Sequence, residues 1–350
     1  MTQGTNEKST APVHRKPLAG AFRRVRVSSE TIQLLVLAVI LFVFFSIIVE
    51  KFLTVRSITS MGFQMPELGV LTLAMMISIY TGGINLSVNA TSNLAAVLAG
   101  FFMVKFIPKD AAGAVVTLYL AVAFLIAIVV GWLCGMVNGL LIGYVGVPPI
   151  LATLATMTLF TGISTGLTGG ATVTGFPTQL SVIGAQTILG IPIPFLIFVG
   201  FTILTYILLD RTSFGFKARL LGSNPVAAEF SGIDNRAILM GAYMYSGILS
   251  AVTGLLIMGR TMSAAYEYGT TTYVLLTILI CVLANVNPGM GRVIDVFIAV
   301  VILQILSTGF QMALSGVRGS TFFKDFAWGI LLILVFVANY FIRGRRAQSS

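Results

Sequence analysis

The sequence predicts an all-α polytopic membrane protein with about ten transmembrane helices, some of them broken or re-entrant, and with both termini in the cytoplasm. Apolar residues make up 57% of the 350-residue chain and charged residues only 9%, against about 25% charged residues in an ordinary soluble domain. The mean hydropathy of +0.99 suits helices that face lipid on all sides. The apolar runs are about 20 residues long and do not alternate in polarity, which argues against a β-barrel.

The predicted spans follow one another with polar connections between them. Several are shorter than the roughly 20 residues that a straight membrane-spanning helix needs, so broken or re-entrant segments are expected among them. The apolar stretches lie near residues 31–49, 66–80, 91–107, 112–134, 148–167, 193–209, 237–258, 271–286, 294–314 and 326–342.

The basic residues set the expected orientation. Residues 1–30 are polar and basic and lack a signal-peptide cleavage pattern, so we expect a cytoplasmic leader ahead of the first span. With this leader inside, fourteen of the 21 Lys and Arg residues fall on the cytoplasmic side, as the positive-inside rule requires. The expected organisation is a leader at 1–30, a transmembrane domain at 31–342 with a cytoplasmic loop at 210–236, and a cytoplasmic tail at 343–350.

Residues for enzymatic or metal chemistry are sparse. The single histidine, His14, lies in the leader, which removes most histidine-based catalytic schemes. Cys134 and Cys281 lie inside apolar runs without CxxC or Cys/His spacing, so neither a disulfide framework nor a metal site is indicated. The basic residues flank apolar segments instead of gathering with aromatic residues on one module, so nucleic acid is not an expected partner. We therefore expect neither catalytic residues nor a metal.

Four glycines are spaced for close helix packing. Gly131, Gly135, Gly139 and Gly143 recur every four residues and so share one face of a helix, where a neighbouring backbone can approach closely. This helix must end before Pro148 and Pro149. The expected role of the four glycines is packing.

A polar stretch, Thr81–Asn93, interrupts what would otherwise be continuous membrane helix. It contains two glycines and three asparagines. Irregular backbone at membrane depth is tolerated only where it is buried in protein or lines a wet cavity. The residues alone leave two interpretations open, namely a broken helix beside a solute path and an interfacial turn between two spans.

The loop at 210–236 carries a helix signature. Asn224 is suited to an N-cap, Pro225 to the first helical position and Gly232 to a C-terminal stop. These residues predict a short helix on the cytoplasmic face. It is either a docking element for a cytoplasmic protein or a surface helix without a partner.

Three of these stretches resemble one protein family, the permease subunits of bacterial ribose-, xylose-, arabinose- and galactose-type ABC importers. Thr81 to Ser87 is similar to the family's T-G-G-I-D-L-S-V segment. Gly135 to Gly170, with V-N-G-L-L-I, V-P-P-I-L-A-T-L-A-T-M and L-T-G-G, is similar to its central block, and Thr212 to Ile233 is similar to its cytoplasmic coupling segment.

The resemblance implies a pair of permease subunits, either a homodimer or two paralogues, that face each other across a solute path in the bilayer of the bacterial inner membrane. A periplasmic solute-binding protein would deliver the solute, and separate ABC ATP-binding subunits would carry the ATP and Mg, so no cofactor is expected on this chain. The implied ATPase-coupling loop contains Gly215, Arg219, Gly222, Asn224, Pro225, Ala228, Glu229 and Gly232. The implied substrate path contains Gly82, Gly83, Asn85 and Ser87, and we add Asn89 and Asn93, which follow one helical turn later.

The chain departs from the family pattern in two places. Asn85 stands where the family usually has Asp, which removes a buried charge and lowers the cost of holding that site in the membrane. Val282–Gly291 replaces the family's G-G-T-S-L-x-G-G-x-G with a segment that contains Asn285, Asn287 and Pro288. A neutral path lined by amides and hydroxyls suits several small polar solutes.

The expected function is translocation of a monosaccharide or related polyol into the cytoplasm. A branched-chain amino acid, a nucleoside or an autoinducer-like sugar is an alternative solute for the same type of permease. A secondary transporter should carry an ionisable residue in the middle of a span, whereas Glu67 and Asp295 lie near the ends of predicted helices. A purely structural scaffold would need no cytoplasmic docking loop.

Overall fold

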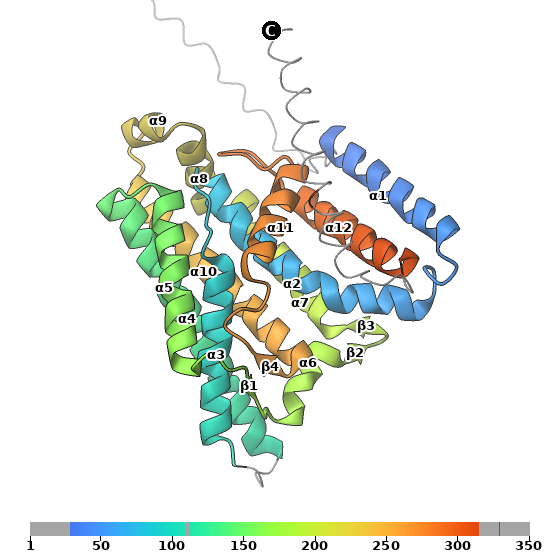
Figure 1. The fold of residues 1–350 in the computed structure, drawn as a ribbon. Helices are drawn as coiled ribbons and strands as arrows, with labels where there is room; N and C mark the ends of the chain where they lie inside the picture. The colour runs from blue at the N-terminus through green and yellow to red at the C-terminus, as the bar shows by residue number, and fades with distance from the viewer. Residues whose placement is uncertain (1–28, 109–112, 315–328, 330–350) are drawn as a thin grey trace, which may run out of the picture.

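A computed structural model describes residues 29–108, 113–314 and 329 of the chain, and these residues form a bundle of long helices (Figure 1). Within them, eight helices are long and apolar enough to cross a membrane. The predicted tail, residues 1–28 of the predicted leader and all but one residue of the predicted tenth span lie outside the described residues. The eight helices are α1 (Ser29–Ile48), α2 (Val55–Tyr80), α3 (Val88–Phe106), α4 (Gly113–Gly139), α5 (Pro149–Thr168), α7 (Ile193–Arg211), α10 (Asn235–Thr261) and α12 (Val293–Ala313).

Shorter elements connect these helices. A π-helical turn, η1 (Leu140–Val145), extends α4, and the apolar helix α11 (Thr270–Leu283) lies between α10 and α12. The remaining helices are the 3-10 turn η2 (Thr178–Leu180), α6 (Ser181–Ala185), α8 (Ser213–Ser223) and α9 (Pro225–Phe230). Strand β1 (Val173–Thr174) pairs antiparallel with β4 (Ser263–Ala264), and β2 (Thr187–Ile188) pairs antiparallel with β3 (Ile191–Pro192).

The connections divide between the two ends of the bundle. Figure 1 shows α8 and α9 at one end, and α6 with the four short strands at the other. This is the arrangement expected if the loop at 210–236 is cytoplasmic and the connections around 169–192 and 262–269 are on the outer side. We therefore call the end with α8 and α9 the cytoplasmic end, and the other the outer end.

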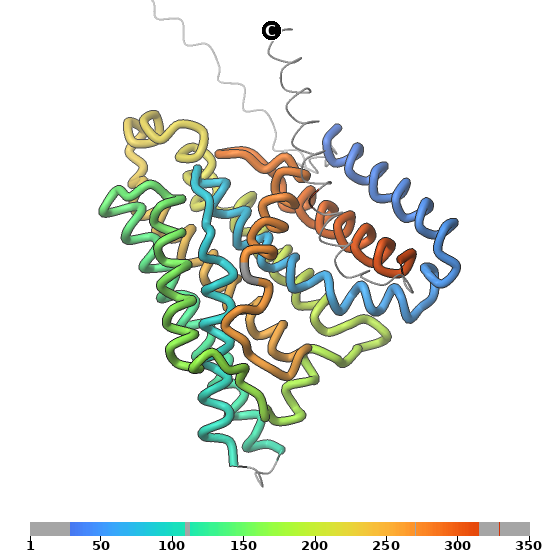
Figure 2. Tube along the Cα trace, in the orientation of Figure 1, coloured from blue at the N-terminus to red at the C-terminus, as the bar shows by residue number. Residues whose placement is uncertain are grey.

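Helix α10 lies at the centre of the packing. It contacts α2, α3 and α4. Helix α1 packs against α12 on the side of the bundle away from α4 and α5 (Figure 2). The largest cluster of buried apolar residues joins α2, α7, α10, α11 and α12. Helices α2, α10 and α12 are buried over most of their length, as expected for the interior of a membrane protein, whereas α7 contributes one face.

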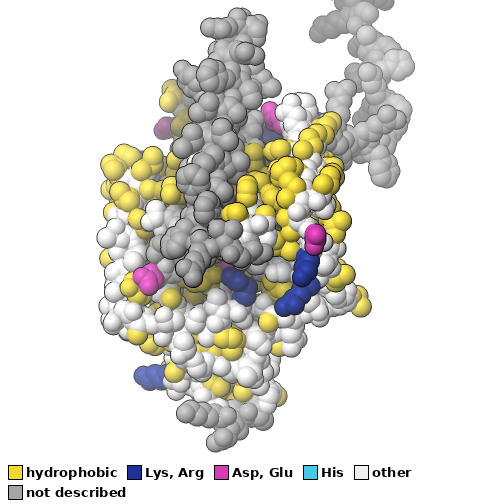
Figure 3. Space-filling model, turned by 45° about the vertical axis from the view of Figure 1, so that its right-hand side comes forward, with side chains coloured by type: hydrophobic (Ala, Val, Ile, Leu, Met, Phe, Trp, Pro, Cys, Tyr) yellow, Lys and Arg dark blue, Asp and Glu magenta, His cyan; other side chains and the backbone are white. Residues whose placement is uncertain are grey.

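Large apolar side chains also cover the surface. Ile47 on α1 is 78% exposed, and α4, α5 and α7 each expose several Leu, Ile or Val side chains. On the face drawn in Figure 3, apolar side chains are abundant and charged ones are few. Such a surface is stable only against lipid or another apolar protein surface.

Helix α2 starts earlier than the hydropathy predicts. Its first residue is Val55, capped by Thr54, whose Oγ1 accepts the N–H of Ser57 at 3.3 Å, and Pro66 lies inside the helix. Because the predicted span begins at residue 66, the sequence places Glu67 near a helix end. That expectation is wrong, because Glu67 lies in the middle of α2.

Candidate solute path and coupling surface

The four spaced glycines of α4 and η1 lie against α10. A Cβ atom on Gly131 would collide with the carbonyl oxygen of Gly247, and one on Gly135 would collide with that of Tyr243. Gly139 lies beside Met240, and a Cβ atom on Gly143 would come 3.0 Å from the carbonyl oxygen of Arg236. Since there is no room for a side chain, the glycine spacing sets how closely α4 and α10 pack.

The break between α2 and α3 begins as a tight helix stop. Gly82 has φ of +95°, its N–H donates to the carbonyl of Ile79, and the N–H of Gly83 donates to that of Ser78, both at 2.9 Å. This is a Schellman motif, in which glycine takes the left-handed position without a Cβ penalty. A Cβ atom on Gly83 would also collide with the hydroxyl of Tyr243.

Asn85 anchors the break to α10. Its Nδ2 donates to Ser246 Oγ at 3.0 Å, and Ser246 in turn donates to the carbonyl of Ala74 at 2.8 Å. The Oδ1 atom of Asn85 accepts the N–H and the hydroxyl of Ser87, at 3.1 and 2.8 Å. The amide therefore both donates and accepts, which an ionised carboxylate at this position could not do.

The same network continues into α4 and α5. Asn138 on α4 donates from Nδ2 to Ser87 Oγ at 2.8 Å, and Thr156 on α5 donates to Asn138 Oδ1 at 2.6 Å. Thr153 donates to the carbonyl of Ile84 at 3.0 Å. The polar groups of the break are thus partnered by four helices, and Gly82, Gly83, Asn85 and Ser87 are not among the residues that line a described cavity.

Asn89 and Asn93 lie in the first turns of α3 and point to the connection between α10 and α11. Asn89 Nδ2 donates to the carbonyl oxygen of Tyr268 at 2.8 Å, and Asn93 Nδ2 donates to those of Tyr266 and Tyr268 at 3.0 Å. The two asparagines are four residues apart and so share one face of the helix. They satisfy backbone carbonyls of a segment, residues 262–269, that has little regular structure.

Asn89 and Asn93 also line a cavity of about 850 Å³, which we call the α3–α5 groove. One wall is α5, and the other is formed by the 262–269 segment and the start of α11. The hydroxyl, amide and carboxylate side chains of the lining come from all three elements, and the glycines of α5 open space between them. These residues are Asn89, Asn93, Thr158, Thr161, Thr165, Tyr266, Glu267 and Thr271, with Gly162, Gly166 and Gly169.

The groove offers weak hydrogen-bonding groups along one helix face. The hydroxyls of Thr158 and Thr165 donate to the carbonyls of Leu154 and Thr161, at 3.2 and 2.9 Å, and their oxygen lone pairs remain available as acceptors. Among the described lining residues, Glu267 is the only charged side chain. Such a surface can contact a hydroxyl-rich solute at many points without binding it strongly.

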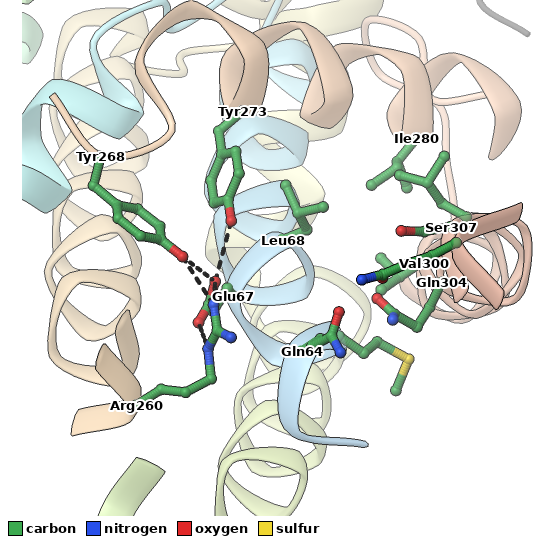
Figure 4. A pocket seen from close by; sticks show the side chains of 13 residues that line it. Gln64, Glu67, Leu68, Arg260, Tyr268, Tyr273, Ile280, Val300, Gln304 and Ser307 are labelled. Atoms are coloured by element: carbon green, nitrogen blue, oxygen red, sulfur yellow. Dashed lines mark hydrogen bonds and ion pairs between the residues drawn. The ribbon is translucent and has the colours of Figure 1, made fainter. Parts of the chain in front are cut away.

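A second cavity, of about 340 Å³, lies deeper in the subunit around Glu67 (Figure 4). Arg260, at the end of α10, donates to both oxygens of Glu67, from Nε to Oε1 and from Nη2 to Oε2 at 3.0 Å. The hydroxyls of Tyr268 and Tyr273 donate to Oε2 at 3.3 and 3.2 Å. Glu67 is 2% exposed, and its carboxylate is surrounded by donors, as a buried charge requires.

Tyr268 links the two cavities, because its side chain lines the cavity around Glu67 and its backbone carbonyl is held by Asn89 and Asn93, which line the groove. Its backbone carbonyl is held by α3 beside the groove, and its hydroxyl also accepts a hydrogen bond from Arg260 Nη2 at 2.8 Å. Burial, reinforced by the charge of Glu67, raises the pKa of the Tyr268 hydroxyl. This shift favours the protonated hydroxyl, which donates a hydrogen bond to Glu67.

The predicted cytoplasmic helix is present as α9. Asn224 Oδ1 accepts the N–H groups of Val226 and Ala227, at 3.1 and 3.0 Å, and Pro225 is the first helical residue. Gly232 follows the helix with φ of +78°. The sequence did not predict the preceding helix α8, which Thr212 caps through a 3.4 Å bond from the N–H of Gly215.

Helix α8 packs tightly against the cytoplasmic end of α2. Arg219 Nε donates to the hydroxyl of Tyr80 at 2.8 Å, and Gly222 lies so close that a Cβ atom there would collide with the carbonyl oxygen of Tyr80. That carbonyl accepts the N–H of Gly289 at 2.9 Å, from the Val282–Gly291 segment in which the chain departs from the family. Gly215 is packed equally tightly against the backbone of Leu209.

The outward face of this cytoplasmic loop differs from its packed face. Ala228 is buried, whereas Glu229 is exposed and the apolar side chains of Val226 and Phe230 are 61% and 89% exposed. Exposed aromatic residues on a short helix are a common feature of protein interfaces. The loop therefore has one side packed on the membrane helices and an exposed side that carries the apolar side chains of Val226 and Phe230.

The groove residues of α5 and of the 262–269 segment are not among the path residues predicted from the sequence. The signal on α5 was present, because Thr158, Thr161 and Thr165 fall on one helix face with glycines between them. Glu267 had no comparable signal, since its segment takes its position from contacts to distant helices. In the described part of the chain, His, Cys, Asp and Glu side chains form no group of three that could hold a metal ion.

A bundle of long apolar helices, with a groove whose largely apolar lining carries hydroxyl and amide groups and with a helical cytoplasmic loop, defines a multi-pass membrane transport protein. Residues 57–336 match the family described as "Branched-chain amino acid transport system / permease component", and the chain belongs to that family. It is 31% identical over 280 residues to the autoinducer 2 import system permease protein LsrD of Yersinia enterocolitica, which covers 78% of this chain and 80% of the relative. The proteins of the same name from Yersinia pestis and Yersinia pseudotuberculosis are 30% identical over 78% of this chain and 79% of theirs.

No solved structure matches the chain. The family membership confirms the expectation that this protein is a multi-pass permease subunit of a bacterial importer of the ATP-binding-cassette type, located in the inner membrane. It also answers the question raised by Glu67 in the middle of α2. The chain belongs to a family of importer permeases although Glu67 lies inside a span, and in this subunit the carboxylate is held by Arg260 and two tyrosines.

Proposed function

We propose that the α3–α5 groove is one half of the path along which a neutral, hydroxyl-rich solute of the sugar or polyol class enters the cytoplasm. The observation that carries the proposal is the lining of the groove, in which threonine hydroxyls of α5 and asparagine amides of α3 are set into an otherwise largely apolar surface. A path must be weakly polar, since a site that bound the solute tightly would hold it there.

A second permease subunit would supply the other half of the path. The face of α5 that lines the groove is exposed in the single subunit, and Gly162, Gly166 and Gly169 leave open space in front of it. Membrane helices with small residues on one face pack closely against a partner helix. The partner is either a second copy of this chain or a paralogous permease.

Separate subunits would supply the energy and the solute. ATP-binding subunits, which hold the ATP and Mg, would dock on the exposed side of α8 and α9, where Val226 and Phe230 offer apolar anchors. A periplasmic binding protein would deliver the solute at the outer end. The importers named for the relatives carry autoinducer 2, and a small sugar-like molecule of that kind fits a groove that offers hydroxyls, amides and a single carboxylate.

The experiment is ATP-dependent uptake into proteoliposomes that contain the permease with its native ATP-binding subunits and binding protein. Labelled autoinducer 2, pentoses, hexoses, polyols, a nucleoside and leucine form the panel. Uptake of one sugar or polyol, absent without ATP, is the expected result. Uptake of leucine alone would favour the amino-acid alternative suggested by the family description, and no ATP-dependent uptake of any solute would contradict the proposal.

A further inference from the structure

A continuous set of contacts runs from the cytoplasmic loop to the outer wall of the groove, with helix α2 at its centre. At the cytoplasmic end of α2, Tyr80 is fully buried and contacts Arg219 and Gly222 of α8. In the middle of α2, Glu67 contacts Arg260, Tyr268 and Tyr273. The two contact points are 13 residues apart, which corresponds to about 20 Å along a helix that rises 1.5 Å per residue.

The stretch of α2 between these points is suited to move as one body. The residues from Val70 to Ile77 are all fully buried, and Ser246 of α10 donates to the carbonyl of Ala74 at 2.8 Å. Pro66 directly precedes Glu67 and has no backbone N–H to donate to the carbonyl of Gly62. The helix is therefore weakest on the outer side of Glu67 and intact between Glu67 and Tyr80.

Tyr268 connects Glu67 to the lining of the groove. The hydroxyl of Tyr268 donates to Glu67 Oε2 at 3.3 Å and accepts from Arg260, while its backbone carbonyl accepts from Asn89 and Asn93 inside the groove. Figure 4 shows the hydroxyls of Tyr268 and Tyr273 converging on Glu67 from the side opposite Gln64. A displacement of Glu67 thus pulls on the segment that carries Tyr266 and Glu267.

The alternative role for a carboxylate inside a membrane helix is proton transfer. The geometry does not favour it here, because the guanidinium of Arg260 and two tyrosine hydroxyls already occupy both carboxylate oxygens. A group held by so many donors is fixed in position. A fixed, directional contact is what a mechanical joint between two elements requires.

We propose that α2 transmits movement of the cytoplasmic loop to the 262–269 wall of the groove, with the Glu67–Arg260–Tyr268 contacts as the joint. The proposal rests on the proposed function, because it assumes that this groove is the solute path and that partner ATPases move α8. Rigid displacement of packed helices is an established way to carry such a change. Arg260 and Tyr268 are then positioning residues, which act on the solute through the groove wall.

The test compares two tyrosine variants in the reconstituted importer. Tyr268→Phe keeps the ring and removes the hydroxyl that contacts Glu67. Tyr245→Phe, the control, removes a hydrogen bond of 2.8 Å between α10 and Thr205 on α7 that involves none of the groups bound to Glu67. ATP hydrolysis and solute uptake are measured together, and Thr271→Cys, in a background without Cys134 and Cys281, reports the accessibility of the groove wall to a polar thiol reagent with and without ATP.

The expected result is that Tyr268→Phe retains ATP hydrolysis, imports severalfold less solute per ATP, and loses the ATP-dependent change in labelling at position 271. Tyr245→Phe should behave like the parent protein in all three measurements. The proposal would be overturned if Tyr268→Phe imported as much solute per ATP as the parent protein and kept the parent's ATP-dependent change in labelling. It would also be overturned if hydrolysis and uptake fell by the same factor. Failure of the proposed function is distinguishable, because then the parent protein itself shows no ATP-dependent uptake.

Discussion

Gly131 on α4 and Gly247 on α10 touch backbone to backbone, so that a Cβ atom on either residue would collide with the carbonyl oxygen of the other. This contact fixes the separation of the two helices at the centre of the bundle. The same close packing continues along the two helices as far as η1, where Gly143 lies against the first turn of α10. This explains why the four-residue glycine spacing extends from α4 into η1.

Gly131→Ala should therefore lower the stability of the protein. The added methyl group forces α4 away from α10, and overpacking of this kind costs about 1–3 kcal/mol. Gly200→Ala on α7 is the control, because no other element of the described chain has an atom within 4 Å of the position its Cβ would take. Thermal unfolding in detergent should show a lower midpoint for Gly131→Ala only. Equal midpoints for the two variants would show that the close contact is not maintained.

Asn85→Asp, which restores the residue usual in the family, should also destabilise this chain. Asn85 Nδ2 donates to Ser246 Oγ, whose own hydrogen is used by the carbonyl of Ala74. A carboxylate takes away the donor and adds a buried charge, and one broken buried hydrogen bond costs about 1–3 kcal/mol. Thr117→Val, which removes an exposed hydroxyl on α4, serves as the control in the same unfolding measurement. A stability of Asn85→Asp equal to that of the parent would contradict the network.

Glu267→Gln should slow import of a hydroxyl-rich solute. The carboxylate of Glu267 in the groove can accept hydrogen bonds from solute hydroxyls, and an amide accepts them more weakly. We expect uptake to fall severalfold while ATP hydrolysis continues, and an anionic solute to compete better than it does in the parent protein. Glu50→Gln, an exposed position at the outer end of α1, should leave uptake unchanged. Equal uptake by both variants would remove Glu267 from the path.

Phe230→Ala should weaken binding of the ATP-binding subunits. The Phe230 side chain is 89% exposed on α9, and aromatic anchors of this kind carry a large share of interface energy. We expect the affinity to fall about tenfold or more, equivalent to about 1.4 kcal/mol per factor of ten. Phe106→Ala, which removes an exposed phenylalanine at the outer end of α3, is the control. Co-purification and binding measurements with intact complexes distinguish the two, and equal affinities would place the docking surface elsewhere.

Most spans could be predicted from the sequence because lipid imposes a simple rule on it. Apolar runs locate α5 and α12 within one residue and α7 and α10 within three. The rule fails at α2, where Ser57, Gln64 and Pro66 lower the apparent hydropathy of a helical segment whose polar side chains have partners in the protein. Burial among other helices, unlike exposure to lipid, leaves no continuous apolar signal.

The candidate path could be predicted only in part for a related reason. Asn89 and Asn93 were predicted only because they follow the broken segment by one helical turn, and they line the groove. Glu267 and Tyr266 lie in a connection whose position depends on contacts to α3 and α2, more than 170 residues earlier, and no local pattern encodes such contacts. The motif residues Asn85 and Ser87 attract notice in the sequence, yet their hydrogen bonds hold four helices together beside the break.

The central claim is that solute crosses along the α3–α5 groove, and thiol labelling of Thr161→Cys tests it most directly. The variant is made in a background without Cys134 and Cys281 and reconstituted with the partner subunits, and Leu125→Cys on the exposed apolar face of α4 is the reference. We predict that a polar, membrane-impermeant reagent labels position 161 much faster than position 125, and that turnover with ATP and the transported solute changes the rate at 161 only. Labelling of position 161 as slow as that of position 125, in every state, would contradict the account.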